Sequence, residues 1–390
     1  MRILEEIDKR LEKGDNTDAL IGAELKLRRN SLSKTLESVC GDTCSISYLS
    51  KVENNEIRPN PKLLEELCKK VNLKKENIDL IKRGREVYKE TIDAYFIQDS
   101  VKLNEIYEEC FEMKNYRSKI MKLFHLVYVG NMRVAKRIIG ELEKIMSSIL
   151  YSDLVIYTFI LAEYFYKDNE KLKAFKLYKK LISLDLEYKK IYILSLEGIM
   201  RILKEINSPL YLGYFDELKN AYIDELYYDR IPKLEENILW YYLQNGFYNL
   251  VLDKINNSNQ EYRSIKLIVC AKLGIKLDED IKPTGFSEMV YLYHFNLMKF
   301  YEGFNNDNLN LSDSEYLIIK LMYNYLSKKD LYSYLSCEFF PYAFSTKDQK
   351  LITVSFNLIM EELKNRSKYK KCLDYLDMLL NYRKECEEYC

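Results

Sequence analysis

Apolar residues recur at intervals of three and four along most of this 390-residue chain, with little of the alternation that predicts β-strands. Proline and glycine number only 6 and 12, and they gather where one periodic segment gives way to the next. The pattern predicts an all-α protein. An apolar content of 47% is ample for the cores of two or three domains.

A second regularity appears beyond about residue 100, in the segment DLVIYTFILAEYFYKDNEKLKAFKLYKKLISLD. Its small and large residues fall at the offsets of a tetratricopeptide hairpin, in which a small residue lets two antiparallel helices touch. The residues concerned are Ala162, Phe165, Ala174, Tyr178 and Leu181.

Weaker copies of the same pattern occur on either side of this hairpin. They involve Leu123, Leu126, Ala135 and Ile139, and near the end Met360, Leu363, Cys372 and Leu376. Because a single hairpin cannot bury its apolar face without neighbours, we predict an α-solenoid of degenerate TPR-like helical hairpins over residues 101–390. An irregular helical bundle is the alternative.

The segment SISYLSKVENNEIRPNP, residues 45–61, predicts a short helix capped by Ser45, with Leu49 and Val52 as its inward residues. The other side of this helix is polar and aromatic, which indicates a surface that contacts another molecule. That side carries Ser47, Tyr48, Lys51 and Asn54.

Two further short amphipathic helices flank this segment. LSKTLESV precedes it, with Leu32, Leu36 and Val39 inward, and the turn CGDTC, which contains Gly41, separates the two. PKLLEELCKKVNL follows, with Pro61 in its first turn. Its buried stripe is Leu64, Leu67, Cys68 and Val71.

Taken in order, IGAELKLRR, LSKTLESV and SISYLSKVENNEIRPNPKLLEELCKKVNL resemble the five-helix repressor/Cro-type helix-turn-helix of the XRE family. This family places its recognition helix in the major groove of DNA. The resemblance implies that Ile46, Ser47 and Lys51 meet base edges, with Asn54 and Arg58 near phosphates and Tyr48 in the same DNA-binding set. It also implies an ion pair between Arg28 and Glu53 that fixes the angle of the recognition helix.

An XRE domain followed by some 300 tetratricopeptide-like residues resembles the RRNPP class of Gram-positive quorum-sensing regulators, whose solenoids bind short imported signal peptides. That resemblance implies asparagines that clamp a peptide backbone, since an amide both donates and accepts hydrogen bonds. The candidate peptide-binding residues are Asn237, Tyr241, Asn296, Asn324 and Asn357. The sequence leaves open whether these asparagines are ligand contacts, helix caps or solvated residues.

The expected organisation is an amphipathic extension over residues 1–17, an XRE-type helix-turn-helix domain over 18–74, a linker helix over 75–100, and a peptide-sensing and dimerisation domain over 101–390. The expected partners are a double-stranded DNA operator, a short signal peptide and a second copy of the chain. Two alternatives remain. One is a helical-repeat scaffold, tethered to DNA, that binds a protein partner and no peptide, and the other is constitutive DNA binding without any ligand.

Catalytic chemistry is not indicated. His125 and His294 lie far apart without a Ser or Cys motif beside them, and neither GxxxxGK nor GxGxxG occurs. The pairs Cys40/Cys44 and Cys386/Cys390 each lack the further ligands of a structural zinc site. We therefore expect no enzyme, no metal and no cofactor. Nine cysteines without a repeating spacing and a charged amino terminus favour a cytoplasmic location without a membrane anchor.

Overall fold

The computed structural model describes residues 2–13, 21–57, 59–73, 87–112, 115–184, 186, 188–258, 260–305, 309–327, 330–346 and 349–387. Within these ranges the regular secondary structure is helical, apart from an isolated bridge between Gly285 and Asn310. The predicted all-α fold is confirmed. The chain divides into two compact units, Met1–Ile202 and Leu203–Cys390.

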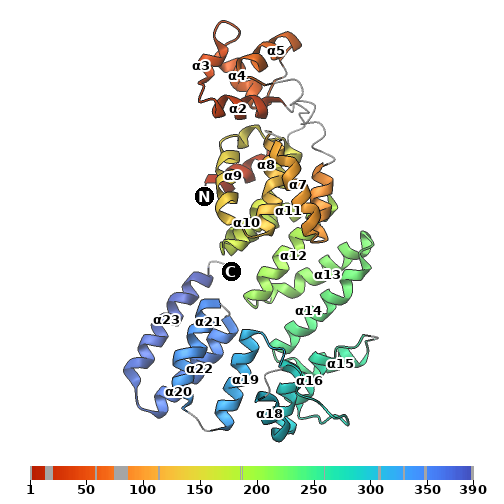
Figure 1. The fold of residues 1–390 in the computed structure, drawn as a ribbon, viewed down its shortest axis with the longest axis vertical. Coiled ribbons are helices and arrows are strands. Elements are labelled where there is room, and N and C mark those ends of the chain that lie inside the picture. The colour runs from red at the N-terminus through yellow and green to blue at the C-terminus, as the bar shows by residue number, and fades with distance from the viewer. Residues whose placement is uncertain are drawn as a thin grey trace. The chain divides into compact units, whose positions relative to one another are not determined.

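The first unit contains a group of short helices and a stack of longer ones (Figure 1). The elements are α1 (Arg2–Lys13), α2 (Ile21–Ser31), α3 (Leu36–Cys40), α4 (Ile46–Glu53), α5 (Pro61–Lys70), a helix over residues 87–96, α7 (Ser100–Glu112), α8 (Tyr116–Tyr128), α9 (Met132–Glu143), the 3-10 turn η1 (Met146–Ser148), α10 (Tyr151–Lys167), α11 (Lys171–Ile182) and α12 (Lys189–Glu205), which runs into the second unit.

Helices α2–α5 form the helix-turn-helix domain around a core that includes Leu25, Leu49, Val52 and Leu67. The described residues between 21 and 70 hold four of the five expected helices, and residues 74–86 lie outside the described part of the chain.

Helix α3 begins later than the sequence predicted. Thr35 caps it by accepting the Ser38 N–H, so Leu32 lies in the preceding turn and is exposed rather than buried. Ser33 in the same turn has a positive φ of 52°. Because Thr35 is the cap, α3 begins at Leu36, four residues after the predicted start at Leu32.

The predicted hairpin over residues 151–182 is confirmed as the antiparallel pair α10 and α11. Ala162, Ala174, Tyr178 and Leu181 are all fully buried there. Gly198 of α12 lies against the Tyr178 ring, and a Cβ at that position would come within 2.6 Å of the ring. Helices α8 and α9 repeat the arrangement, with Ala135 buried between them. Helix α1 packs on α10, α11 and η1, and so belongs with the repeats.

The second unit continues the helical pairs. Its elements are α13 (Leu210–Asp224), η2 (Tyr228–Arg230), α14 (Ile231–Gln244), α15 (Tyr248–Asn256), α16 (Arg263–Leu273), α17 (Phe286–Phe295), α18 (Leu297–Phe304), α19 (Asp313–Leu326), α20 (Leu331–Tyr334), the π-helical turn η3 (Leu335–Phe339), α21 (Phe340–Thr346), α22 (Gln349–Asn365) and α23 (Tyr369–Glu387).

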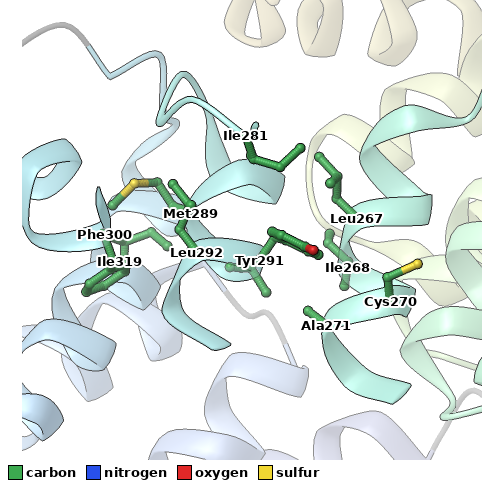
Figure 2. Close-up of a cluster of buried hydrophobic side chains, with 11 residues drawn as sticks. Leu267, Ile268, Cys270, Ala271, Ile281, Met289, Tyr291, Leu292, Phe300 and Ile319 are labelled. Atoms are coloured by element: carbon green, nitrogen blue, oxygen red, sulfur yellow. The ribbon is translucent and has the colours of Figure 1, made fainter. Parts of the chain in front are cut away.

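One core of this unit joins α16, α17, α18 and α19. Figure 2 shows Tyr291 of α17 pointing towards Ile268 and Ala271 of α16, while Met289 lies beside Phe300 and Ile319. A further cluster ties α20, η3 and α21 to α22 and α23, through residues such as Leu335, Ile359 and Leu363.

The final pair departs from the predicted repeat in one respect. Leu363 and Cys372 are buried as expected, but Leu376 is 37% exposed. Helix α23 instead turns Cys372, Tyr375 and Leu379 towards the solenoid, with the Tyr375 ring at 5.0 Å from that of Phe340. Leu376 therefore lies beside the packed face and not within it.

Candidate nucleic-acid interface and ligand groove

Helix α4 has one buried and one free face, as the sequence predicted. Ser45 caps it by accepting the Tyr48 N–H at 3.1 Å, and Leu49 and Val52 are each 1% exposed. Ile46 is 49% exposed, and Ser47 and Lys51 are exposed beside it. These three side chains share the accessible side of a capped, well-anchored helix.

The carboxyl end of α4 is held by an ion pair. Glu53, whose side chain is 3% exposed, accepts two hydrogen bonds from Arg29, at 2.7 Å from Nε and 2.8 Å from Nη2. The predicted partner, Arg28, is therefore wrong by one residue. Consecutive residues of a helix point about 100° apart, so only one of the two arginines can reach the carboxylate.

The remaining predicted contacts of this set differ in placement. Tyr48 is half-buried against the helix-turn-helix core. Asn54 was expected near phosphates, but its Oδ1 accepts the Lys26 ammonium at 3.1 Å and the hydroxyls of Ser147 and Ser148 at 3.3 and 3.4 Å. Asn54 thus faces η1 of the repeat region. Arg58 lies outside the described residues.

Asn55 makes a second connection to η1 that sequence reasoning missed. Its Oδ1 accepts the Gly22 N–H at 3.0 Å, and its Nδ2 donates to the Ser148 carbonyl at 2.6 Å. Its φ of 59° lies in the left-handed region, which asparagine tolerates better than most residues. Gly22 is required there because a Cβ would lie 2.2 Å from the Val52 carbonyl oxygen. The doubled asparagine after α4 was the available signal.

Glu24 makes the third connection. It is 1% exposed, and its Oε1 accepts the backbone N–H of Tyr116, the first residue of α8, at 2.7 Å. Burial raises the pKa of the Glu24 carboxyl to about 7, although this N–H and the nearby Lys119, Arg117 and Arg28 act in the opposite direction. A glutamate between Ala23 and Leu25 is the sequence signal for a buried carboxyl.

Tyr116 in turn reaches a buried ion pair of the repeat core. Its hydroxyl hydrogen-bonds Asp153, which also accepts from Arg117 Nε at 2.8 Å. The side chains of Arg117 and Asp153 are 1% and 2% exposed. Backbone and side chain of one tyrosine therefore connect the helix-turn-helix domain with the interior of α8 and α10.

The predicted peptide-binding residues come from several helices of the second unit, namely α14, α19, α22 and the junction of α17 with α18. Asn237 accepts a 2.7 Å hydrogen bond from Lys204, and Tyr241 is buried, stacked on Tyr211 at 4.8 Å. Asn296 caps α18 by accepting the Lys299 N–H at 3.2 Å, which is the capping alternative that the sequence left open. Asn324 is buried, whereas Asn357 is exposed.

A groove of about 520 Å³ opens in the second unit. Its walls are α13, α14 and α15, with a Lys219–Glu235 ion pair of 2.8 Å and the Lys254 ammonium 5.8 Å from the Tyr242 ring centre. Ser258 and Tyr262 line both this groove and an adjoining one of about 380 Å³. The lining mixes aromatic rings with charges of both signs.

Comparison with known proteins gives little. No family model matches the chain, and no curated protein does. Among solved structures, the crystal structure of the SHP pheromone receptor Rgg2 of Streptococcus dysgalactiae aligns over 94% of this chain and 99% of its own, with 13% identity and a TM-score of 0.21. A superposition of that quality carries no argument about function.

No helix in the described part of the chain is long and apolar enough to cross a membrane.

Proposed function

We propose that this protein is a DNA-binding transcription regulator whose helical repeats bind a short signalling peptide and modulate operator binding. DNA binding is supported by α4, a capped helix that the Arg29–Glu53 pair anchors. Ile46, Ser47 and Lys51 are exposed on its free side. Such a helix fits the major groove, where Lys51 suits the acceptors of guanine.

Modulation of DNA binding by the repeats is supported by the contacts that attach the helix-turn-helix domain to them. Glu24, Asn54 and Asn55 bind α8 and η1 through side chains that are buried or half-buried. A change in the repeats that moves these two elements must strain or release the helix-turn-helix domain.

The groove between α13 and α15 is our proposed peptide site. Aromatic side chains such as Phe215, Tyr242 and Tyr262 offer apolar contact with polar tips, and Lys254 and Asp216 offer charges of both signs. One wall of the groove is α14, the helix that also carries the predicted residues Asn237 and Tyr241, so the groove is the first place to test. Asn296, Asn324 and Asn357 stay predictions.

DNA binding is tested by fluorescence anisotropy on the region upstream of the gene, at several salt concentrations. The proposal requires an affinity at least about a thousandfold above that for unrelated DNA, together with a linear fall of log affinity against log salt. Equal affinity for both DNAs would contradict operator recognition.

Peptide binding is tested by thermal shift with short peptides encoded beside the gene. Ligand at a hundred times its dissociation constant should stabilise the second unit by about 2.7 kcal/mol. Tyr242→Ala should abolish that shift, whereas Tyr325→Ala, an exposed tyrosine of α19, should keep it. If no peptide binds but a large protein does, the scaffold alternative is favoured instead.

A further inference from the structure

One face of α9 is a stripe of exposed positive charge. The opposite face is buried in the repeat core through apolar side chains such as Ile138 and Leu142. The last three cations of the stripe follow the first by three, four and eleven residues, a spacing that keeps them on one side of a helix. The four cations, which we call the basic stripe, are all exposed: Arg133, Lys136, Arg137 and Lys144.

Acidic side chains of the described chain do not balance the basic stripe. None of its four cations forms an ion pair with another described residue. Glu141 pairs with Lys119 of α8, and Glu143 is exposed at the edge of the stripe. Like charges three and four residues apart destabilise a helix, and so does a cation in the first turn, where Arg133 lies. An anionic partner would remove this repulsion.

The middle of the basic stripe has no side chain. Gly140 lies between Arg137 and Lys144 on the same face, and a Cβ at Gly140 would meet nothing within 4 Å. Packing therefore does not require this glycine, although glycine weakens the interior of a helix. Its effect is to leave a gap in which a ligand can approach the helix backbone closely between flanking cations.

The basic stripe begins close to the candidate DNA interface. Asn54 directly follows α4 and accepts the Ser147 hydroxyl at 3.3 Å. Lys144 lies three residues before Ser147, so the chain spans at most about 11 Å between them. Arg133 is about 17 Å further along α9, at 1.5 Å per residue. Figure 1 shows α8 and α9 side by side below α2.

We propose that the basic stripe binds the sugar–phosphate backbone of the DNA next to the site that α4 contacts. The inference rests on the DNA binding proposed above and assigns the helical repeats a direct part in it. B-DNA carries a phosphate on each strand about every 3.4 Å of its axis, so a stripe of about 17 Å spans about five base pairs. Arginine and lysine bind phosphates without reading the base sequence, so the stripe adds affinity and fixes orientation.

Charge alone would also suit an anionic membrane, but the packing of α9 favours DNA. A helix that lies on a membrane surface inserts its apolar face among the lipids. The apolar face of α9 is already packed in the repeat core, so only its cations are free to make contacts.

Gly140→Glu tests the basic stripe without removing any of its cations. The variant sets a carboxylate among them and replaces glycine with a better helix former, so it should fold. In anisotropy titrations with the region upstream of the gene, its affinity should fall about tenfold below that of the wild type. Gly140→Gln, which is equally helical but uncharged, should lose less. Equal affinity in all three proteins would overturn the inference.

The salt dependence of binding gives an independent measurement. Arg133→Gln/Arg137→Gln removes two phosphate contacts, so the slope of log affinity against log salt should become shallower by about 1.8. Lys176→Gln/Lys179→Gln is the matched control, since it removes two exposed cations of α11 and should keep the wild-type slope. The same change of slope in both double variants would reflect net charge alone and would refute the contact.

These measurements separate the basic stripe from the proposed function. If the wild type prefers its upstream DNA and the α9 variants match it in affinity and slope, α4 binds DNA without the stripe. A wild type that binds no DNA would contradict both proposals. Vesicles of phosphatidylglycerol are the competing probe: if Gly140→Glu abolishes vesicle binding and leaves DNA affinity unchanged, the stripe belongs to a membrane contact instead.

Discussion

The Glu24 carboxylate accepts the backbone N–H of Tyr116 at 2.7 Å, and this contact ties α2 of the helix-turn-helix domain to the first turn of α8. A carboxylate at a helix amino terminus is favoured by the helix dipole, but here it is buried with a pKa raised to about 7. We therefore expect the attachment of the helix-turn-helix domain to the repeats to depend on pH.

The sign of that dependence follows from proton binding. Between its ordinary value of 4.5 and about 7, Glu24 holds a proton in the folded protein and not in the unfolded chain. The first unit should thus lose about 3 kcal/mol of stability as the pH rises from 4.5 to 7, and little more above that. Unfolding in urea, followed by hydrogen exchange at the α2 and α8 amides, measures it.

Glu24→Gln keeps an acceptor for the Tyr116 N–H but cannot ionise, so its stability should stay flat over that pH range. Glu66→Gln, a change at an exposed position of α5, should keep the wild-type slope. A slope that Glu24→Gln leaves unchanged would assign the pH dependence to another group.

Asn55→Ala should loosen the same attachment. It leaves the Gly22 N–H and the Ser148 carbonyl without their partner and puts alanine at a positive φ, which together should cost about 2–4 kcal/mol. Asn55→Gly removes the bonds but suits the backbone, so it should cost less. Hydrogen exchange at the Gly22 amide is the measurement, and it should be faster in both variants. Unchanged exchange in both would show that Asn55 does not hold the helix-turn-helix domain to η1.

Removing Arg29 should destabilise the helix-turn-helix domain far more than removing Arg28. Arg29→Ala leaves Glu53 buried without its counter-charge and should destabilise the helix-turn-helix domain by about 3–5 kcal/mol. Exchange rates at the α4 amides report the loss. Arg28→Ala serves as the matched control, and equal losses in the two variants would argue against a specific role for the Arg29–Glu53 pair.

Lys51→Ala tests the DNA-reading face. Since Lys51 is exposed on the free side of α4 and is our proposed base contact, the change should cost about 1–3 kcal/mol of operator affinity and relax the preference at one base pair. Lys282→Ala, which also removes one exposed positive charge but in the second unit, should leave anisotropy titrations unchanged. Full operator specificity in Lys51→Ala would place the base contacts elsewhere.

Asn296→Ala separates capping from ligand binding. The loss of the bond to the Lys299 N–H should lower the melting temperature of the free protein, at a cost of about 1 kcal/mol, and leave peptide affinity by calorimetry unchanged. Asn357→Ala should change neither, because Asn357 is exposed on α22. Weaker peptide binding without a lower melting temperature would return Asn296 to the ligand site.

Local sequence rules determined much of the fold. The Ser45 cap, the inward Leu49 and Val52, and Pro61 at the start of α5 follow from preferences that act within one or two helical turns. The hairpin of α10 and α11 was equally predictable, because its small residues at Ala162 and Ala174 directly set how closely the helices approach.

Contacts between distant segments were not predictable. Asn55 meets Ser148 across 93 residues and Glu24 meets Tyr116 across 92, so each depends on where η1 and α8 come to rest. The choice of Arg29 over Arg28 depended on the rotation of α2 about its axis, and the exposure of Leu376 on that of α23.

Periodicity tells which residues can share a helix face, since that depends on backbone geometry alone. What the face meets is decided by the packing of whole helices, in which many small contacts far apart in sequence compete at once. For this protein, the sequence by itself determined a helical chain with a helix-turn-helix domain near its amino terminus. Only the tertiary structure decided that this domain is attached to the first repeats by buried polar side chains.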